Sequence, residues 1–308
     1  MKIYNVGIIG CGLIGAKRAK SLGERAKLIA CCDIDLKKAK KIAKESNALI
    51  FKDWNDLIKL DEIDIVIVAT LHNTLYPIAK ETILAGKHLL IEKPGAKNSS
   101  ELKELIEVSK KSNLKIRVGF NHRYHPAILK AKNIIENGAL GDLMFIRGRY
   151  GHGGRIGYEK EWRANPSLSG GGELIDQGPH LIDLSSMFLG QFTKISGSAH
   201  TYFWKMPVED NAFMILKNDE NKTAFLHVSC TEWKNMFSME IYGKRGKLEI
   251  NGLGGSYGVE KLTHYNMLKE MGPPETSEWE YPEADNSWSI EINDFFNDIE
   301  NNNEPEAN

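Results

Sequence analysis

A short glycine pattern constrains the fold of this chain more than any other feature. Residues 10–15 read G-C-G-L-I-G, which matches G-x-G-x-x-G. An apolar, β-branched run over residues 3–9 precedes the pattern, and a helical apolar stripe that starts at Leu13 follows it. A strand, this turn and a helix are together typical of the first unit of a dinucleotide-binding domain. The pattern therefore predicts a parallel sheet with helical connections and a bound dinucleotide.

Each position of the pattern has a physical role. Gly10 permits the tight turn, Gly12 lets the backbone approach a diphosphate, and Gly15 allows the helix to pack close to the strand. The helix opens with Leu13 and Ile14, where free N–H groups and a partial positive charge favour phosphate. We therefore predict that these five residues bind the cofactor.

An acidic residue indicates which dinucleotide is bound. Asp33 ends the second apolar run and follows Gly15 by about the 20 residues typical of this fold. Its carboxylate is suited to accept hydrogen bonds from ribose hydroxyls and to repel a 2′-phosphate, and the next residue is Ile34 rather than arginine. Lys37 and Lys38 remain within reach of a 2′-phosphate. The sequence therefore favours NAD over NADP.

The first 120 residues alternate strand and helix signals. Helical stripes separate six apolar runs, several of which are too continuous for a half-exposed strand and suit a buried parallel sheet. These runs lie at 3–9, 27–32, 48–51, 64–69, 88–91 and 115–119. We predict an α/β fold in which residues 1–121 form a doubly wound Rossmann domain.

The pattern changes after residue 121. A helical segment over 125–137 is followed by glycine-rich loops and then by alternating apolar runs with hairpin-like turns. Strands are expected at 143–150, 194–203, 213–216, 223–230, 236–242 and 246–251. We assign residues 122–308 to a second, α+β domain for substrate binding and oligomerisation, with helices on one face of a mostly antiparallel open sheet. An exposed apolar sheet face usually means self-association, so we expect a homodimer or homotetramer.

Composition argues against several classes of protein. The formal net charge is −1 at pH 7, so nothing favours nucleic acid or an anionic membrane as a partner. No apolar stretch approaches the roughly 20 residues of a membrane-spanning helix, and no signal peptide precedes the first apolar run. The four cysteines lack C-x-x-C spacing, which disfavours a zinc site or a redox pair. Reduced thiols without an export signal lead us to expect a cytoplasmic protein.

Two further elements carry polar chemistry. Residues 92–94, E-K-P, end the fifth apolar run, and ligands of open α/β sheets bind beyond the carboxyl ends of strands. Residues 170–180 read G-G-G-E-L-I-D-Q-G-P-H and place Asp176 and His180 four residues apart, on one face if the segment is helical. Pro179 opposes a continuous helix and fits a first helical turn, with Asp176 just outside it. Taken alone, the pair is explained equally well by a helix-capping aspartate and a structural histidine.

The order of these elements resembles the glucose–fructose oxidoreductase/inositol dehydrogenase family (Gfo/Idh/MocA). The resemblance covers nearly the whole chain, and the E-K-P and D-x-x-x-H elements at these separations make it specific. It implies a Rossmann domain followed by an α/β domain with an open antiparallel sheet. It also implies a tightly held nicotinamide cofactor, a sugar, polyol or nucleotide-sugar substrate, and catalytic roles for Lys93, Asp176 and His180.

The chemistry of these three side chains fits such roles. Oxidation of a secondary alcohol requires transfer of a hydride to the nicotinamide and loss of the hydroxyl proton. His180 is the natural acid/base, because an imidazole has an unperturbed pKa near 6.5. Lys93 is suited to stabilise the developing alkoxide, and Asp176 to orient His180 or to bind the substrate. We also expect Glu92 and Lys93 to border the cofactor.

The chain departs from the family pattern in two places. Many relatives read A-T-P-N-x-x-H where residues 69–75 read A-T-L-H-N-T-L, so the proline and the terminal histidine are absent. Thr70, His72 and Asn73 are still expected to contact the cofactor. The family pattern also usually continues into a further C-terminal helix, whereas this chain ends at Asn308, so we expect that element to be absent or truncated.

Other polar residues follow the sixth apolar run and the glycine-rich loops. Asn121 and Arg123 are expected near the cleft. Arg163 lies in a segment that resembles the family's substrate loop, where a guanidinium is suited to bind hydroxyl or phosphate groups bidentately. A structural hydrogen bond explains each of the three equally well, and His122 and His125 are interpreted as structural. No ligand spacing supports a metal site.

The leading hypothesis is therefore reversible oxidation of a secondary hydroxyl on a sugar, cyclitol or nucleotide sugar with NAD. One alternative is a non-catalytic sensor that binds a dinucleotide, although a sensor has no need of Lys93, Asp176 and His180. Another is an enzyme that keeps NAD bound and uses it transiently for elimination, hydrolysis or epimerisation. Net release of NADH distinguishes a simple dehydrogenase from the second alternative.

Overall fold

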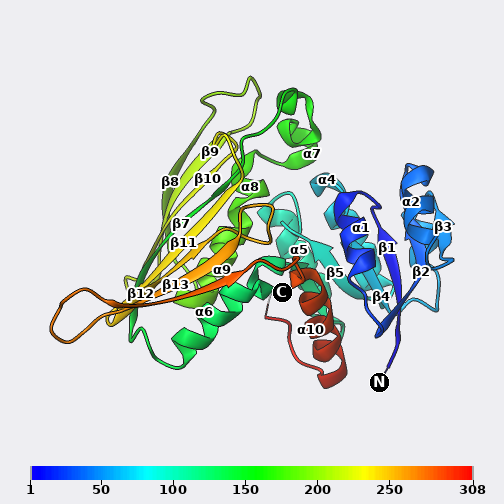
Figure 1. The fold of residues 1–308 in the computed structure, drawn as a ribbon. Helices are drawn as coiled ribbons and strands as arrows, with labels where there is room; N and C mark the ends of the chain where they lie inside the picture. The colour runs from blue at the N-terminus through cyan, green and yellow to red at the C-terminus, as the bar shows by residue number, and fades with distance from the viewer. Residues whose placement is uncertain (1, 307–308) are drawn as a thin grey trace. The chain divides into compact units, whose positions relative to one another are not determined.

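The computed structural model describes residues 2–306 and divides into two units (Figure 1). The first unit contains the described residues up to Phe120 and those from Trp288 onward, and the second runs from Asn121 to Ser287. The sequence placed the boundary one residue later and assigned the whole C-terminal part to the second domain. That assignment differs from the structure after Ser287, because the last helix packs its apolar side chains into the core of the first unit.

The first unit is built on one parallel sheet. Its strand order is β3-β2-β1-β4-β5-β6, and every neighbouring pair runs parallel, which confirms the predicted doubly wound sheet. The strands are β1 (Tyr4–Ile9), β2 (Ala26–Cys32), β3 (Leu49–Phe51), β4 (Ile65–Val68), β5 (His88–Glu92) and β6 (Ile116–Gly119). The strand order reverses between β1 and β4, and ligands of such sheets bind outside the carboxyl ends of the strands at that point.

Helices cover both faces of this sheet. They are α1 (Leu13–Lys20), α2 (Leu36–Ala43), α3 (Trp54–Ile58), α4 (His72–Leu84), α5 (Ser99–Ser109) and α10 (Ser287–Asn301). Ile8 belongs to a core shared with Phe295 and Phe296 of α10, whereas the next residue, Ile9, belongs to a second core shared with Leu75 of α4. Because both faces are buried, the strands read as continuous apolar runs in the sequence.

The second unit is built on a larger, mixed sheet. Its order is β14-β13-β12-β11-β7-β10-β9-β8, and all neighbouring pairs are antiparallel except β10 with β7. The strands are β7 (Leu143–Gly151), β8 (Lys194–His200), β9 (Asn211–Lys217), β10 (Thr223–Ser229), β11 (Met236–Gly243), β12 (Gly246–Asn251), β13 (Glu260–Asn266) and β14 (Glu275–Tyr281). The predicted, mostly antiparallel sheet is confirmed, and β13 and β14 extend it beyond the expected strands.

Two long helices pack against one face of the second sheet. They are α6 (Pro126–Glu136) and α9 (Gly178–Leu189), and shorter segments connect them to the strands. The short segments are the 3-10 helices η1 (Asn121–Tyr124), η2 (Tyr158–Lys160) and η3 (Trp162–Ala164), with α7 (Pro166–Ser169) and α8 (Glu173–Asp176). Buried residues such as Ile146, Leu226 and Met239 face the helices, whereas Arg147 and Phe225 on the same strands are exposed. The alternation is that of a sheet with one covered face.

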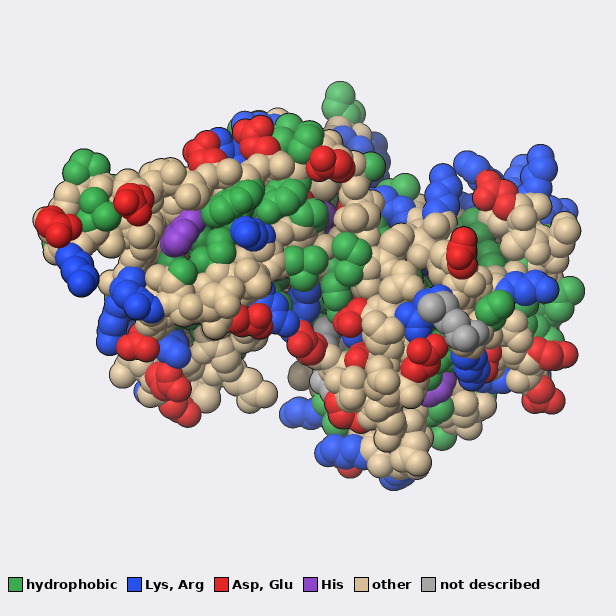
Figure 2. Space-filling view, turned by 60° about the horizontal axis from the view of Figure 1, so that its bottom comes forward, with side chains coloured by type: hydrophobic (Ala, Val, Ile, Leu, Met, Phe, Trp, Pro, Cys, Tyr) green, Lys and Arg blue, Asp and Glu red, His purple; other side chains and the backbone are tan. Residues whose placement is uncertain are grey.

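The surface carries charges of both signs. Figure 2 shows acidic and basic side chains interspersed over the face in view, in keeping with the balance of 40 Lys and Arg against 41 Asp and Glu in the sequence. Among the described residues, no helix combines the length and the apolar character needed to cross a membrane. Within residues 2–306, no three His, Cys, Asp or Glu side chains are grouped so as to hold a metal ion.

Candidate functional site

The glycine turn joins β1 to α1 in the first unit. Gly10 has a φ of +92°, and a Cβ atom there would lie 2.4 Å from the carbonyl oxygen of Ala69. A Cβ atom on Gly15 would lie 1.9 Å from the carbonyl oxygen of Gly10, so these two glycines are required by close packing. Gly12 is different, because no described atom lies within 4 Å of the position that its Cβ would take. The space beside Gly12 is therefore open to a ligand.

The start of α1 is equally suited to an anion. Gly12 occupies the N-cap position, and no described side chain caps the helix. The N–H groups of the first turn, which begins with Leu13 and Ile14, therefore retain their capacity to donate to phosphate. Leu13 is 76% exposed and leaves the turn accessible. An open cradle beside uncapped N–H groups fits the diphosphate of a dinucleotide.

Asp33 lies directly beside the glycine turn. Its Oδ2 accepts a hydrogen bond from the backbone N–H of Cys11 at 2.8 Å, and its Oδ1 accepts one from the N–H of Asp35 at 2.8 Å. These two bonds hold the carboxylate at the end of β2, next to the turn. Lys37 and Lys38 are exposed on α2. The local charge near Asp33 is therefore mixed, as the sequence indicated.

The segment with the unusual A-T-L-H-N-T-L sequence forms the junction between β4 and α4. Thr70 precedes the helix, and His72 and Asn73 occupy its first turn. His72 is buried, and Thr70 and Asn73 are half-buried. The side-chain Oδ1 of Asn73 is buried and accepts no hydrogen bond from the described residues. A buried acceptor without a donor fits a site that a ligand completes.

The E-K-P segment ends β5. Glu92 is buried, and its Oε1 accepts a hydrogen bond from Nε of Arg18 on α1 at 2.7 Å. The same guanidinium also pairs with Glu291 of α10, and its face lies 4.5 Å from the ring centroid of Trp288. The contacts of Glu92 are thus those of an internal ion pair, and its place beside the cofactor stays a prediction. Lys93 follows directly and is half-buried.

In the second unit, the helix is interrupted between Asp176 and His180. Asp176 ends α8, Gln177 joins the two helices, and Pro179 lies in the first turn of α9, where its missing N–H has no helical partner to lose. The expectation that Pro179 opens a helix with Asp176 just outside is confirmed. Asp176 is 5% exposed and His180 is 4% exposed. Both side chains are therefore held in the interior rather than on a solvated helix face.

Arg163 is the partner of Asp176. Its Nε donates to Oδ2 of Asp176 at 2.8 Å, and its Nη1 lies 4.0 Å from Glu161. Burial opposes the charge on the guanidinium, but the adjacent Asp176 carboxylate raises the pKa of Arg163. Arg163 therefore remains a cation, and about a third of its side chain (35%) is exposed. Of the three residues predicted to bind substrate, this one retains an accessible guanidinium.

The other two predicted substrate residues have internal partners. Asn121 is buried, and its Nδ2 donates to Oγ of Ser287 at 2.9 Å. Arg123 forms a bidentate pair with Asp183 of α9, with distances of 2.8 and 2.6 Å. These contacts are structural ones, so the role of both residues in binding substrate stays a prediction without support from the geometry.

Sequence reasoning missed two polar residues near Asp176, Tyr158 and Glu173. The hydroxyl of Tyr158 donates to Oε1 of the buried Glu173 at 2.7 Å, and Nε2 of His152 lies 3.5 Å from the same oxygen. Burial raises the pKa of Tyr158 and of Tyr150, so both phenols are neutral donors at physiological pH. Glu173 lies three residues before Asp176 in the G-G-G-E-L-I-D segment, and this spacing on one helical turn is the only signal that could have identified it.

The sequence also missed a ring contact of His180. The imidazole of His122 stacks on that of His180, with centroids 3.7 Å apart and an interplanar angle of 15°. Tyr150 contacts both rings edge-on, at 5.2 Å from His122 and 6.0 Å from His180. His122 belongs to η1, more than 50 positions before His180 in the chain, and no local pattern relates the two.

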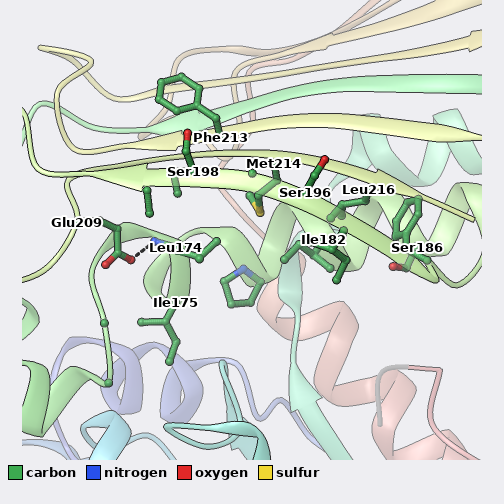
Figure 3. A pocket seen from close by; sticks show the side chains of 18 of the residues that line it. Leu174, Ile175, Ile182, Ser186, Ser196, Ser198, Glu209, Phe213, Met214 and Leu216 are labelled. Carbon is green, nitrogen blue, oxygen red and sulfur yellow. Dashed lines mark hydrogen bonds between the residues drawn. The ribbon is translucent and has the colours of Figure 1, made fainter.

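The second unit also contains a pocket whose lining does not include these polar residues. It has a volume of about 970 Å³ and lies between α9 and two strands, the edge strand β8 and its neighbour β9. Figure 3 shows Leu174, Ile182 and Met214 on one side of the strands, and Phe213 and Ser198 on the other. The one carboxylate among its lining residues belongs to Glu209, which accepts hydrogen bonds from the N–H groups of Gly172 and Leu174. The lining of this pocket includes neither Asp176 nor His180, so the size of the pocket does not identify the site of proton transfer.

Comparison with known families accounts for both units. Residues 4–120 match the oxidoreductase family with an NAD-binding Rossmann fold, and residues 128–249 match the GFO/IDH/MocA C-terminal domain. The chain belongs to the Gfo/Idh/MocA family. The sequence-based resemblance is therefore confirmed. The glycine turn, the uncapped start of α1 and Asn73 all lie in the NAD-binding domain, so the cofactor is NAD.

Family relatives include enzymes named for sugars and cyclitols. Levoglucosan dehydrogenase from Pseudarthrobacter phenanthrenivorans is 30% identical over 224 residues, which cover 68% of this chain and 57% of that protein. Inositol 2-dehydrogenase from Rubrobacter xylanophilus is 33% identical over 147 residues, which cover 46% of this chain and 42% of that protein. The aligned part of this chain thus spans about half the length of these relatives.

Solved structures of the family share the fold. A structure of levoglucosan dehydrogenase in complex with NADH and levoglucosan has a TM-score of 0.88 at 22% identity, and covers 99% of this chain and 91% of that one. A structure of GenD2 from gentamicin A biosynthesis in complex with NAD has a TM-score of 0.81 at 21% identity, and covers 97% of this chain and 86% of that one. At such identities the likeness is one of fold, and it places this chain within the same two-domain architecture.

Proposed function

We propose that this protein is an NAD-dependent dehydrogenase that oxidises a secondary hydroxyl of a sugar, a cyclitol or a nucleotide sugar. The observation that carries the proposal is that Asp176 and His180 are both buried at the junction of α8 and α9, with Asp176 bound to the cation of Arg163. A buried imidazole close in sequence to a buried ion pair suits proton transfer, and the dinucleotide turn of the first unit suits the cofactor. A secondary alcohol is a substrate that needs both.

In the proposed reaction, the side chains divide the work of removing a hydride and a proton. NAD, when bound, supplies the hydride acceptor. His180 accepts the hydroxyl proton, and the cationic Lys93 stabilises the alkoxide as the proton leaves. Asp176, fixed by Arg163, orients the imidazole or the substrate. In the reverse direction His180 returns the proton to the carbonyl oxygen.

The cofactor is held mainly by backbone in this proposal. The open space at Gly12 and the first turn of α1 accept the diphosphate, and Asp33 accepts hydrogen bonds from the adenosine ribose. The same carboxylate repels a 2′-phosphate, which favours NAD over NADP. Thr70, His72 and Asn73 contact the nicotinamide end, where Asn73 has a buried acceptor to offer. Glu92 supports Lys93 through its ion pair with Arg18.

The substrate class follows from the accessible guanidinium and from the relatives. Arg163 offers a planar set of donors, which binds vicinal hydroxyls or a phosphate. The relatives are named for levoglucosan and for inositol, a sugar derivative and a cyclitol. Both observations support a polyhydroxylated substrate.

The test is the absorbance of NADH at 340 nm when the purified protein and NAD are mixed with polyols, sugars and UDP-sugars. A rise with one class establishes a dehydrogenase for that class. A spectrum of the supernatant of denatured protein, recorded first, reveals any cofactor that co-purifies. Tightly bound nicotinamide without net NADH indicates transient redox chemistry or a sensor instead, and contradicts the proposal.

We also propose that the protein self-associates through the open face of the second sheet. Ile215 and Phe225 are paired neighbours on β9 and β10 and are 38% and 48% exposed. Adjacent apolar side chains on an uncovered sheet face favour a protein partner. Light scattering should show a homodimer or homotetramer, and a strictly monomeric mass contradicts this expectation.

A further inference from the structure

The stacked pair of His122 and His180 is the most unusual contact near the proposed acid/base. The two rings lie nearly parallel at 3.7 Å, and the residues are 7% and 4% exposed. Aromatic rings in proteins more often meet edge-to-face or offset at larger separations. A face-to-face contact between two titratable rings in the interior means that the charge of each ring directly affects the other.

The surroundings fix the plane of His122. Its Nδ1 lies 3.2 Å from Oδ1 of Asn121, whose amide is in turn held by Ser287. Tyr150 and His125 contact the ring edge-on, at 5.2 and 5.6 Å between centroids. Phe237 adds a further T-shaped contact at 6.3 Å, so the ring is enclosed by Asn121 and three rings besides His180. His180 in turn has a rigid surface against which its own plane is set.

Other titratable groups of the second unit surround the pair. They are Tyr150 on β7, Tyr257 before β13, Glu173 and Asp176 on α8, Arg163 on η3, His125 before α6, Glu260 on β13 and Asp285 before α10. Asp176 is neutralised by Arg163, and burial raises the pKa of Tyr150. The Glu260 carboxylate lies 3.0 Å from Nδ1 of His125, the histidine next to His122. An imidazole is the side chain whose ordinary pKa lies nearest to neutral pH, so the charge of the stacked pair itself is the one to consider.

We propose that His122 is a positioning residue that fixes the plane of the His180 ring and forms with it an imidazole pair that holds one proton but not two. The proposal rests on the proposed role of His180 as acid/base. Two cations in contact inside a protein repel strongly, so a proton on either ring disfavours one on the other. The pair must therefore be free of protons when His180 accepts the hydroxyl proton, because a proton already on His122 blocks that step. The two rings then titrate as a coupled pair rather than as independent groups.

His122→Phe tests the proposal, because phenylalanine keeps a ring in the stack but cannot hold a proton. Without His122, only a proton on His180 itself blocks catalysis. The acid limb of the pH profile of kcat/KM should therefore move to lower pH, by about 0.3 units if the two rings share the first proton equally, and should describe a single protonation. The affinity for NAD should not change. An acid limb that moves by less than about 0.2 units in an active variant overturns the proposal.

His227→Phe is the matched control. His227 is also a stacked histidine of the second unit, but its partner is Phe213, at 4.3 Å and 4°, on the open face of the sheet. Loss of this imidazole removes no titrating neighbour from His180. The acid limb of His227→Phe should stay at the wild-type position. An equal shift in both variants would arise from a general change in electrostatics and contradicts the proposal.

A second measurement does not depend on enzymatic activity or on the variant. NMR titration of wild-type protein labelled at the histidine Cε1 carbons reports each ring directly, with His180→Ala used for assignment. A coupled pair shows two steps separated by more than one pH unit, each step visible at both rings. Independent single titrations of His122 and His180 overturn the proposal. Failure of the dehydrogenase assay with coupled titration intact contradicts the proposed function instead.

Discussion

The cofactor region and the acid/base region are built in opposite ways. In the first, the ligand-facing surface is backbone: Gly10 and Gly15 are dictated by neighbouring carbonyl oxygens, and Gly12 leaves a space open. In the second, the surface is made of side chains. They come from three separate stretches of the chain, which contribute His122, Arg163 and His180. A backbone site survives most substitutions of its neighbours, whereas a side-chain site depends on each partner.

The two regions also differ in the surroundings of their ionisable side chains. Asp33 beside the glycine turn is held by backbone N–H groups and stays partly accessible. Asp176 and His180 are buried and depend on Arg163 and on a second imidazole for their electrostatics. The first arrangement needs little beyond correct local conformation, but the second needs the whole unit to be folded. Variants should therefore affect binding and chemistry separately.

The largest effect is expected for His180→Ala. Removal of the acid/base should lower kcat by about 10²–10⁴-fold, because general acid–base catalysis contributes about this factor. The affinity for NAD, measured by fluorescence titration, should persist, because the cofactor turn belongs to the other unit. A variant with full activity removes His180 from the mechanism, and a variant that loses NAD binding shows that the two regions are not independent.

Gly12→Ala isolates the backbone region. The added methyl group enters space that no described atom occupies, so the melting temperature should stay within about 2 °C of wild type. The same group obstructs the approach of the diphosphate, so the Kd for NAD should rise about tenfold or more. Gly272→Ala is the matched control, because its Cβ also meets nothing within 4 Å but lies far along the chain in the second unit. Unchanged NAD binding in Gly12→Ala contradicts a diphosphate site at this turn.

The contrast explains what the sequence could and could not predict. The Rossmann sheet was predictable because continuous apolar runs such as 64–69 occur where both sheet faces are buried, and G-x-G-x-x-G is a local backbone requirement. The second sheet was predictable as a class, because the runs along β9 to β12 alternate. β14 was missed because Glu275–Tyr281 contains three glutamates and only two apolar side chains, Trp279 and Tyr281, which are partly buried at the end of the strand.

The candidate site was predictable only where residues are close in sequence. Asp176 and His180 share one motif, and the effect of Pro179 on the helix follows from its missing N–H. The stack of His122 on His180 depends on packing between η1 and α9, which no local spacing encodes. The helix α10 itself was not predicted, and its place in the first unit has the same cause, because the amphipathic pattern of a helix does not specify which sheet it packs against.

Arg163→Ala should separate substrate binding from proton transfer within the acid/base region. The loss of an accessible, charged hydrogen-bond donor should raise KM about tenfold, with a smaller effect on kcat than that of His180→Ala. Arg163→Lys keeps the charge near Asp176 without the planar fork and should recover kcat more than KM. Steady-state kinetics of both variants make the test. A fall in kcat as large as that of His180→Ala indicates instead that Arg163 acts through Asp176.

The smallest effect is expected for a side chain that supports the backbone region. Nδ1 of His88, at the start of β5, accepts a hydrogen bond from the N–H of Lys115 at 3.0 Å, and burial followed by the charge of Lys2 lowers the pKa of His88. His88 therefore binds a proton more readily in the unfolded chain than in the folded protein. Protonation of His88 should thus destabilise the folded protein as the pH falls below about 6.5. In His88→Gln the amide oxygen can still accept from Lys115 but does not titrate.

The difference in melting temperature of His88→Gln between pH 7.5 and 5.5 should therefore be smaller than that of wild type, by about 1–2 °C. His227→Gln should act in the same direction, because burial also lowers the pKa of His227 in the second unit. NAD affinity should stay unchanged in both variants, since neither ring contributes to the glycine turn. A loss of NAD binding in His88→Gln shows that the first region also relies on side chains at a distance, and removes the contrast between the two regions.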